Sequence, residues 1–203
     1  MNCTLVANSA SALGGGVITG VGTTILNSIL WGNRTGPADD PFTDELAQIE
    51  GGRFSGIDYS CIQGWTGLLG GVGNIGDDPL FVQPNDPDGT RGPAVPDLRL
   101  SAESPLINAG DPDFVAYAGE GDLDGHARVL CGRVDLGAYE FGIGDFNCDR
   151  VAGLDDFAAW ADCMFGPFSD GLPDGCEAFD FNADFDVDLQ DYAGFQAAGL
   201  VRP

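Results

Sequence analysis

The chain of 203 residues contains no lysine and only one histidine, and eight arginines stand against 32 acidic side chains. The formal net charge is −24. A nucleic-acid-binding protein or a protein that adsorbs to anionic membranes needs a basic face, so this composition excludes both classes. One histidine and no CxxC pair are also too little for a typical zinc site.

Long apolar runs are absent as well, so the sequence predicts no membrane insertion. The first residues, MNCTLVANSASALGGG, lack the basic and apolar regions of a signal peptide. We therefore expect any export signal to lie upstream, in a longer protein of which this chain is the C-terminal part. A hydrophobic content of 43% excludes disorder, and 32 glycines indicate many turns.

Residues 1–65 contain short β-branched runs bounded by turn residues. These runs are predicted strands at 3–7, 16–19, 23–26, 27–31 and 57–62. An Asn-Ser pair at Asn8 recurs at Asn27, a spacing of 19 residues, which is near the lower limit for solenoid repeats. Stacked asparagines can hydrogen-bond from one turn to the next. An ordinary antiparallel β domain remains the alternative.

The string NCTLVANSASALGGGVITG…TILNSILWGN resembles the last coils of right-handed parallel β-helix (pectin-lyase-like) proteins that bacteria export. The segment that follows resembles their conserved tail, in the strings IDYSCIQG (57–64), GNIGDDPLF (73–81), DLRLSAESPLINAGDPD (97–113), DLDGHAR (122–128) and VDLGAYEF (134–141). The resemblance implies a mainly β fold in which residues 1–142 form the end of a β-helix and an irregular cap. Apolar residues such as Leu80, Phe81, Leu100 and Ile107 are expected to anchor the cap.

From residue 143 onward the composition changes. Residues 143–203 contain thirteen acidic side chains and two arginines, a net charge of −11. Helical patterns cover 154–164 and 189–200, each with aromatic residues three positions apart on one face. We predict a second, small α-helical domain over 143–203.

An acidic stretch precedes each predicted helix, and the two stretches align over twelve positions: DFNCDRVAGLDD (145–156) and DFNADFDVDLQD (180–191). A 12-residue Ca²⁺ loop supplies oxygen ligands from positions 1, 3, 5, 7, 9 and 12, with a backbone carbonyl at position 7. The first loop would use Asp145, Asn147, Asp149, the Val151 carbonyl and Asp156, with water in place of a side chain at Gly153. The second would use Asp180, Asn182, Asp184, the Asp186 carbonyl, Asp188 and Asp191. We expect two Ca²⁺ sites and tighter binding at the second, which has more carboxylates.

Both loops depart from the usual pattern at position 6. Glycine is normal there because the chain turns with positive φ, but these loops have Arg150 and Phe185. The alternative to calcium is a pair of acidic helix N-termini, where the helix dipole favours aspartate without any metal. That alternative does not explain the D-x-N-x-D string in both copies.

Duplicated loops of this kind, each followed by one helix, resemble a type I dockerin module over residues 144–203. The resemblance implies two bound Ca²⁺ ions and docking onto a cohesin-like protein or a cell-surface component. The positions that dockerins present to cohesin are Leu154-Asp155 and Leu189-Gln190 here, in place of the usual small hydroxyl pair. Calcium binding therefore carries over residue by residue, and cohesin recognition does not.

The six cysteines permit one local bridge. Cys163 ends the first predicted helix and Cys176 precedes the second loop. A disulfide between them would restrain the segment that connects the helix to the loop, but the sequence leaves this pairing open. Cys148 lies at a non-ligand loop position, and Cys3, Cys61 and Cys131 have no evident partners.

No catalytic residue is assigned. His126 is expected to be a turn residue, and no nucleophile elbow or phosphate loop is present. The function we expect is a noncatalytic, extracellular or cell-surface fragment that docks an exported β-helix protein through calcium, and that protein would bind or break down polysaccharide. One alternative is the end of a polysaccharide lyase or glycoside hydrolase whose active site lies upstream. Another is a structural calcium-stabilised module without a partner.

Overall fold

The computed structural model describes residues 1–36, 44–51, 56–84, 96–164, 172–173 and 175–200. The chain divides into two compact units, one of residues 1–114 and 134–138 and one of residues 115–133 and 139–203. This division differs from the boundary expected after residue 142. Residues 115–133 belong with the C-terminal segment, to which the Cys131–Cys148 disulfide ties them.

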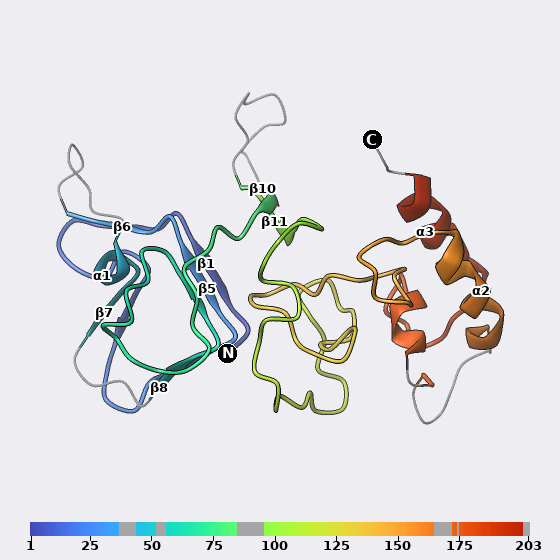
Figure 1. Ribbon diagram of the computed structural model, residues 1–203, viewed down its shortest axis with the longest axis horizontal. Helices are drawn as coiled ribbons and strands as arrows, with labels where there is room; N and C mark the ends of the chain where they lie inside the picture. Colours follow the sequence, from blue (N-terminus) through green and yellow to red (C-terminus); the bar gives the residue numbers. More distant parts are fainter. Residues whose placement is uncertain (37–43, 52–55, 85–95, 165–171, 174, 201–203) are drawn as a thin grey trace. The chain divides into compact units, whose positions relative to one another are not determined.

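In the first unit, short strands pair in parallel between successive passes of the chain (Figure 1). The first pass carries β1 (Thr4–Val6), β2 (Ser9–Ala10), β3 (Val17–Thr19) and β4 (Thr24–Leu26). The second carries β5 (Ile29–Trp31), β6 (Arg34–Thr35), α1 (Glu45–Gln48), β7 (Ile49–Gly51) and β8 (Gly56–Asp58), and β9 (Cys61–Ile62) opens a third. Pairing follows sequence order: β1 with β5, β2 with β6, β3 with β7, β4 with β8, and β5 with β9.

The length of a pass is not constant. Thr4 lies opposite Ile29, an offset of 29 − 4 = 25 residues, whereas Val17 lies opposite Ile49, an offset of 49 − 17 = 32. The additional residues fall between β6 and β7, in the segment that includes α1. Because of the 25-residue offset, Asn8 lies beside Asn33. The predicted 19-residue stacking of Asn8 on Asn27 is wrong.

Left-handed corners separate the strands at matching places in each pass. Asn2, Asn27 and Tyr59 have φ of 52°, 49° and 43°. They precede β1, β5 and β9, and Tyr59 divides the run at 57–62, predicted as one strand, into β8 and β9. Gly32 and Gly64, with φ of 66° and 73°, form the corner that follows β5 and β9, where the missing Cβ removes the cost of positive φ.

Aliphatic side chains from the paired strands form the core of this unit. Leu30, Ile49, Ile57 and Ile62 are buried, and Leu5, Val17 and Ile25 of the first pass pack against them. A polar pair is buried as well. The side-chain amide of Asn33 donates to Gln48 Oε1 at 2.9 Å, and Gln48 Nε2 donates to the Asn33 carbonyl at 2.9 Å.

Beyond β9 the first unit consists mostly of turns. Its one extended element in the described residues is the antiparallel pair β10 (Phe81–Gln83) and β11 (Asp97–Leu100). Phe81, Leu100 and Ile107 are buried, as expected of cap anchors, but Leu80 is exposed. Leu80 has φ of 50°, which turns its side chain out of the core, and Leu106 is the fully buried leucine instead.

The second unit contains α2 (Leu154–Cys163) and α3 (Leu189–Leu200), which agree closely with the predicted helices, and a 3₁₀ turn η1 (Cys176–Phe179), which was not predicted. Among the described residues, the whole chain is thus a mixture of short strands in small sheets and short helices. Right-handed β-helix architecture remains a prediction.

Candidate metal centre

The two acidic loops have the same backbone path, and each leads into a helix at its tenth position. α2 begins at Leu154 and α3 at Leu189. The fourth and sixth positions have positive φ in both loops: 62° at Cys148 and 71° at Arg150 in the first, 58° at Ala183 and 67° at Phe185 in the second. The turn at position 6 is therefore the one that a Ca²⁺ loop requires, although neither residue is glycine.

The first and twelfth positions of each loop are buried aspartates. In the first loop Asp145 Oδ1 accepts from the Asp149 N–H at 3.0 Å and Oδ2 from the Arg150 N–H at 2.7 Å. Asp156 reaches back from α2, with Oδ1 accepting from the Asn147 N–H at 3.0 Å and Oδ2 from the Gly153 N–H at 2.8 Å. These bonds fold the loop around its own carboxylates.

The second loop repeats this pattern with its own aspartates. Asp180 accepts from the N–H groups of Asp184 and Phe185, each at 3.1 Å. Asp191 accepts from the Asn182 N–H at 3.2 Å and from the Asp188 N–H at 2.9 Å. The duplication seen in the sequence is thus a duplication of hydrogen bonding.

Asparagine at position 3 and aspartate at position 5 also face each other in both loops. Asn147 Nδ2 lies 3.3 Å from Asp149 Oδ2, and Asn182 Nδ2 lies 2.9 Å from Asp184 Oδ2. All four side chains are exposed at the loop surface. Val151, assigned a carbonyl role, is half-buried.

Three carboxylates of the second loop come closest together. Single oxygens of Asp184, Asp186 and Asp191 lie within 4.8 Å of one another. Asp186 Oδ1 is shielded from solvent and accepts no hydrogen bond. The predicted role of Asp186 was a backbone carbonyl alone, so its carboxylate is a further candidate ligand. The described part of the first loop has no matching group of three carboxylates. In the second loop, the predicted ligand Asp188 accepts a hydrogen bond from the Gln190 N–H at 2.6 Å.

The aspartate at position 1 of each loop lies in surroundings that raise its pKa and so disfavour its charged form. Burial raises the pKa of Asp145 above its ordinary value, and the neighbouring carboxylates of Asp156 and Asp149 raise it further, against two backbone hydrogen bonds that lower it. Asp180 shows the same balance: burial raises its pKa, with Asp191 and Asp184 adding to the shift. A bound cation would oppose both causes because it favours the charged carboxylates.

An aromatic core holds the two loop–helix segments together. Trp160 of α2 lies 5.5 Å from Phe195 of α3 and 5.0 Å from Phe179 of η1, measured between ring centroids. Val187, at position 8 of the second loop, is buried in the same cluster. The helices therefore fix the position of the carboxylates that precede them.

Two disulfides reinforce the second unit. Cys163–Cys176, which the sequence left open, is formed and buried between α2 and η1. Cys131–Cys148 was not predicted, because no pattern in the sequence pairs either cysteine. Cys3 and Cys61 are free thiols.

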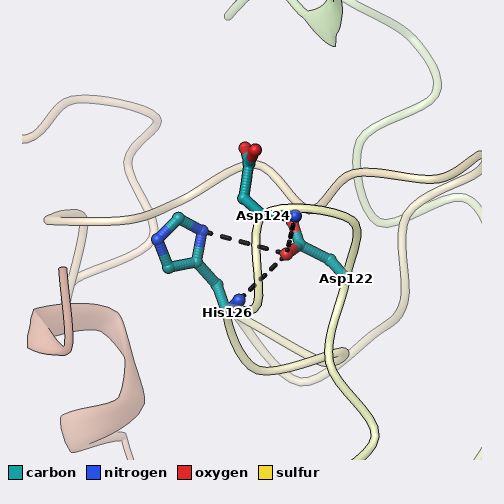
Figure 2. A group of neighbouring side chains, drawn as sticks. All are labelled: Asp122, Asp124 and His126. Carbon is teal, nitrogen blue, oxygen red and sulfur yellow. Dashed lines mark hydrogen bonds and ion pairs between the residues drawn. The ribbon is translucent and has the colours of Figure 1, made fainter. Parts of the chain in front are cut away.

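A second acidic group lies outside the loops, in the string DLDGHAR (Figure 2). Asp122 Oδ1 accepts from the N–H groups of Asp124 and His126, each at 2.9 Å, and its Oδ2 accepts from the Glu140 N–H at 2.9 Å. His126 Nδ1 lies 3.9 Å from Asp122 Oδ1. Three backbone donors hold the Asp122 carboxylate and so stabilise the turn, and single ligand atoms of Asp122, Asp124 and His126 lie within 4.8 Å of one another.

The same turn is joined to the string VDLGAYEF by a buried ion pair. Arg128 Nη2 lies 2.8 Å from Glu140 Oε1, and both side chains are almost completely shielded from solvent. His126 thus belongs to a structural turn, as the sequence suggested.

Comparison with family models, with curated proteins and with solved structures finds no match for this chain. No helix in the described residues is long and apolar enough to span a bilayer.

Proposed function

We propose that the loops 145–156 and 180–191 each bind one Ca²⁺ ion and that this binding stabilises the second unit. The observation that supports this is the repeated loop geometry: positive φ at position 6 and buried carboxylates at positions 1 and 12, in both copies. Helix-dipole stabilisation accounts for the carboxylates at position 12, which lie in the first helical turn, but not for a buried carboxylate at position 1 or for positive φ at position 6.

The donor set fits calcium. All side-chain donors are carboxylate or amide oxygens, which hard cations prefer, and no sulfur or imidazole lies in a ligand position. The Oδ1 atom of Asp186, buried without a hydrogen-bond partner, supports a cation in the second loop. Ca²⁺ would there supply charge neutralisation and a cross-link between the loop and the first turn of α3.

Isothermal titration of the full chain with Ca²⁺ tests the proposal. We expect two sites, with the second loop tighter, within roughly 10⁻⁷ to 10⁻³ M. Asp184→Ala should remove the tighter site, and the matched change Asp149→Ala, at the same loop position, should remove the weaker one. Absence of heat together with an unchanged melting temperature in Ca²⁺ would reject the proposal.

We further propose that the calcium-loaded module docks the protein onto a cohesin-like protein or another surface component. The supporting observation is a pair of exposed leucines at equivalent helix starts: Leu154 is 88% exposed and Leu189 is 73% exposed. These leucines lie at the two helix starts that a dockerin presents to its partner, so they would form the contact surface of both repeats. Capture of one partner from proteins secreted by the source organism should require Ca²⁺ and be lost in Leu154→Asp/Leu189→Asp, whereas capture that survives both conditions would argue against this surface.

For the first unit we propose the end of a right-handed parallel β-helix in an exported, polysaccharide-associated protein. The parallel register of successive passes supports the architecture, since a parallel crossover is nearly always right-handed. Two disulfides support an oxidising, extracellular setting. An experimental structure with antiparallel pairing in residues 1–62 would contradict the architecture.

A further inference from the structure

The two calcium loops differ in one respect that their ligands do not explain. Position 4 is Cys148 in the first loop and Ala183 in the second, and both residues have the same left-handed backbone conformation. Only Cys148 is cross-linked, to Cys131 in the preceding segment of the same unit. Cys148 lies between Asn147 and Asp149, so the tether is attached between two proposed ligands.

The tether also touches the start of the loop. Cys131 Sγ lies 3.9 Å from the carbonyl oxygen of Asp145, the residue at position 1. The disulfide therefore contacts the loop at two places, three residues apart. The second loop has no equivalent, because its position 4 carries only a methyl group.

The tethered loop is the one with the poorer donor set. Its position 9 is Gly153, and its position 7 is Val151, whereas the second loop has Asp188 and Asp186 at these places. A loop with fewer carboxylates gains less from binding a cation, so the cost of ordering it matters more. A cross-link that restricts the free loop reduces that cost before the ion arrives.

We propose that the Cys131–Cys148 disulfide is a positioning device for the first calcium site, which compensates by preorganisation for the ligands that this loop lacks. The proposal rests on the proposed calcium function. It predicts a site-specific effect: loss of the disulfide weakens the first site and leaves the second nearly unchanged.

The test uses Ca²⁺ titration of the full chain with one site removed at a time. In the Asp184→Ala background, which reports the first site, adding Cys131→Ser/Cys148→Ser should weaken binding by about tenfold or more. In the Asp149→Ala background, which reports the second site, the same pair should change affinity by less than about threefold. Equal effects in the two backgrounds, or no effect on the first site, would overturn the proposal.

Two controls separate this role from a general loss of structure. Near-ultraviolet circular dichroism at saturating Ca²⁺ should match the parent, and Cys163→Ser/Cys176→Ser should lower thermal stability without a selective loss at the first site. If wild-type protein bound no Ca²⁺, the proposed function itself would fail; two wild-type sites with an unaffected first site would reject only the disulfide's role.

If the serine pair does not fold, reduction of the folded Asp184→Ala protein replaces it. Cys148 is exposed and borders a cavity of ≈ 260 Å³, whereas Cys163 and Cys176 are 2% and 5% exposed. A phosphine should therefore reduce the Cys131–Cys148 disulfide before the Cys163–Cys176 disulfide. The phosphine and one water become phosphine oxide, and the disulfide becomes two thiols. Alkylation and mass spectrometry identify the opened bond, and Ca²⁺ affinity is read against the same tenfold expectation.

Discussion

At the scale of single residues, position 6 of the two proposed calcium loops combines positive φ with a side chain that disfavours it. Phe185 and Arg150 have φ of 67° and 71°. A Cβ at positive φ costs roughly 1–2 kcal/mol, which favours glycine. Glycine also makes the unfolded chain more flexible, which lowers the stability by about 0.5–1 kcal/mol. Phe185→Gly should therefore be more stable than Phe185→Ala by up to about 1 kcal/mol. Thermal unfolding of both variants in chelator measures the difference, and Arg150→Gly against Arg150→Ala should repeat it. An alanine variant more stable than the glycine variant would show that the loop does not require positive φ at position 6.

The bounds of the two loops and the helices that follow them could be predicted from the sequence because the 12-residue string is duplicated in register, and the ligand roles of its residues stay a prediction. The position of the Asp186 side chain could not be predicted. Its predicted role came from the position-7 carbonyl, but the curvature of the loop brings its carboxylate beside Asp184 and Asp191. Likewise, the Cys131–Cys148 bond depends on how residues 115–133 fold back, which no local pattern encodes.

At the scale of elements, the stacked passes depend on a buried polar junction. Asn33 Nδ2 donates to Leu5 O at 2.8 Å and to Gln48 Oε1 at 2.9 Å, and Asn33 Oδ1 accepts from the Asn8 N–H at 3.0 Å. Asn33→Ala should therefore cost about 2–3 kcal/mol, because it leaves buried partners without hydrogen bonds. Asn8→Ala, at the exposed end of the same network, should cost less than about 1 kcal/mol. Urea unfolding compares them, and equal losses would contradict a junction centred on Asn33.

Six strands (β1, β3, β4, β5, β8 and β9) overlap the predicted β-branched runs, whereas β2, β6, β7, β10 and β11 were not predicted, and neither was the period. A repeat search assumes a constant spacing, whereas the offsets here are 25 and 32 residues because the segment between β6 and β7 is longer than its counterpart. The left-handed corner at Tyr59 was missed for a related reason. Glycine and asparagine are enriched at positive φ and so predict such a corner, whereas tyrosine is not.

At the scale of the whole molecule, charge is distributed very unevenly. Residues 1–33 contain no charged side chain, whereas residues 143–203 carry a net −11. The uncharged part stacks strand on strand, where a charge directly opposite a like charge would be destabilising. The acidic part instead brings carboxylates together around the loops. Residues 143–203 therefore contribute a larger share of the net negative charge than their share of the chain length.

The pH dependence of stability should report this crowding. Without calcium, the folded-state pKa values of Asp145 and Asp180 lie above their ordinary value, first through burial and then through neighbouring carboxylates. The native state therefore binds protons more readily than the unfolded chain, so stability should rise as pH falls through the raised pKa values, and the gain should be complete below about 3.9.

Melting temperatures of chelated protein between pH 7 and pH 4.5 test the sign. The general relief of a charge of −24 on acidification would give a slope of the same sign, so Asp145→Asn/Asp180→Asn serves as the control and should flatten it. With saturating Ca²⁺ the slope should reverse, because protons then compete with the ion for the same oxygens. A chelated protein that loses stability on mild acidification, with the same slope in the asparagine variant, would show that these two carboxylates are not destabilised in the metal-free fold.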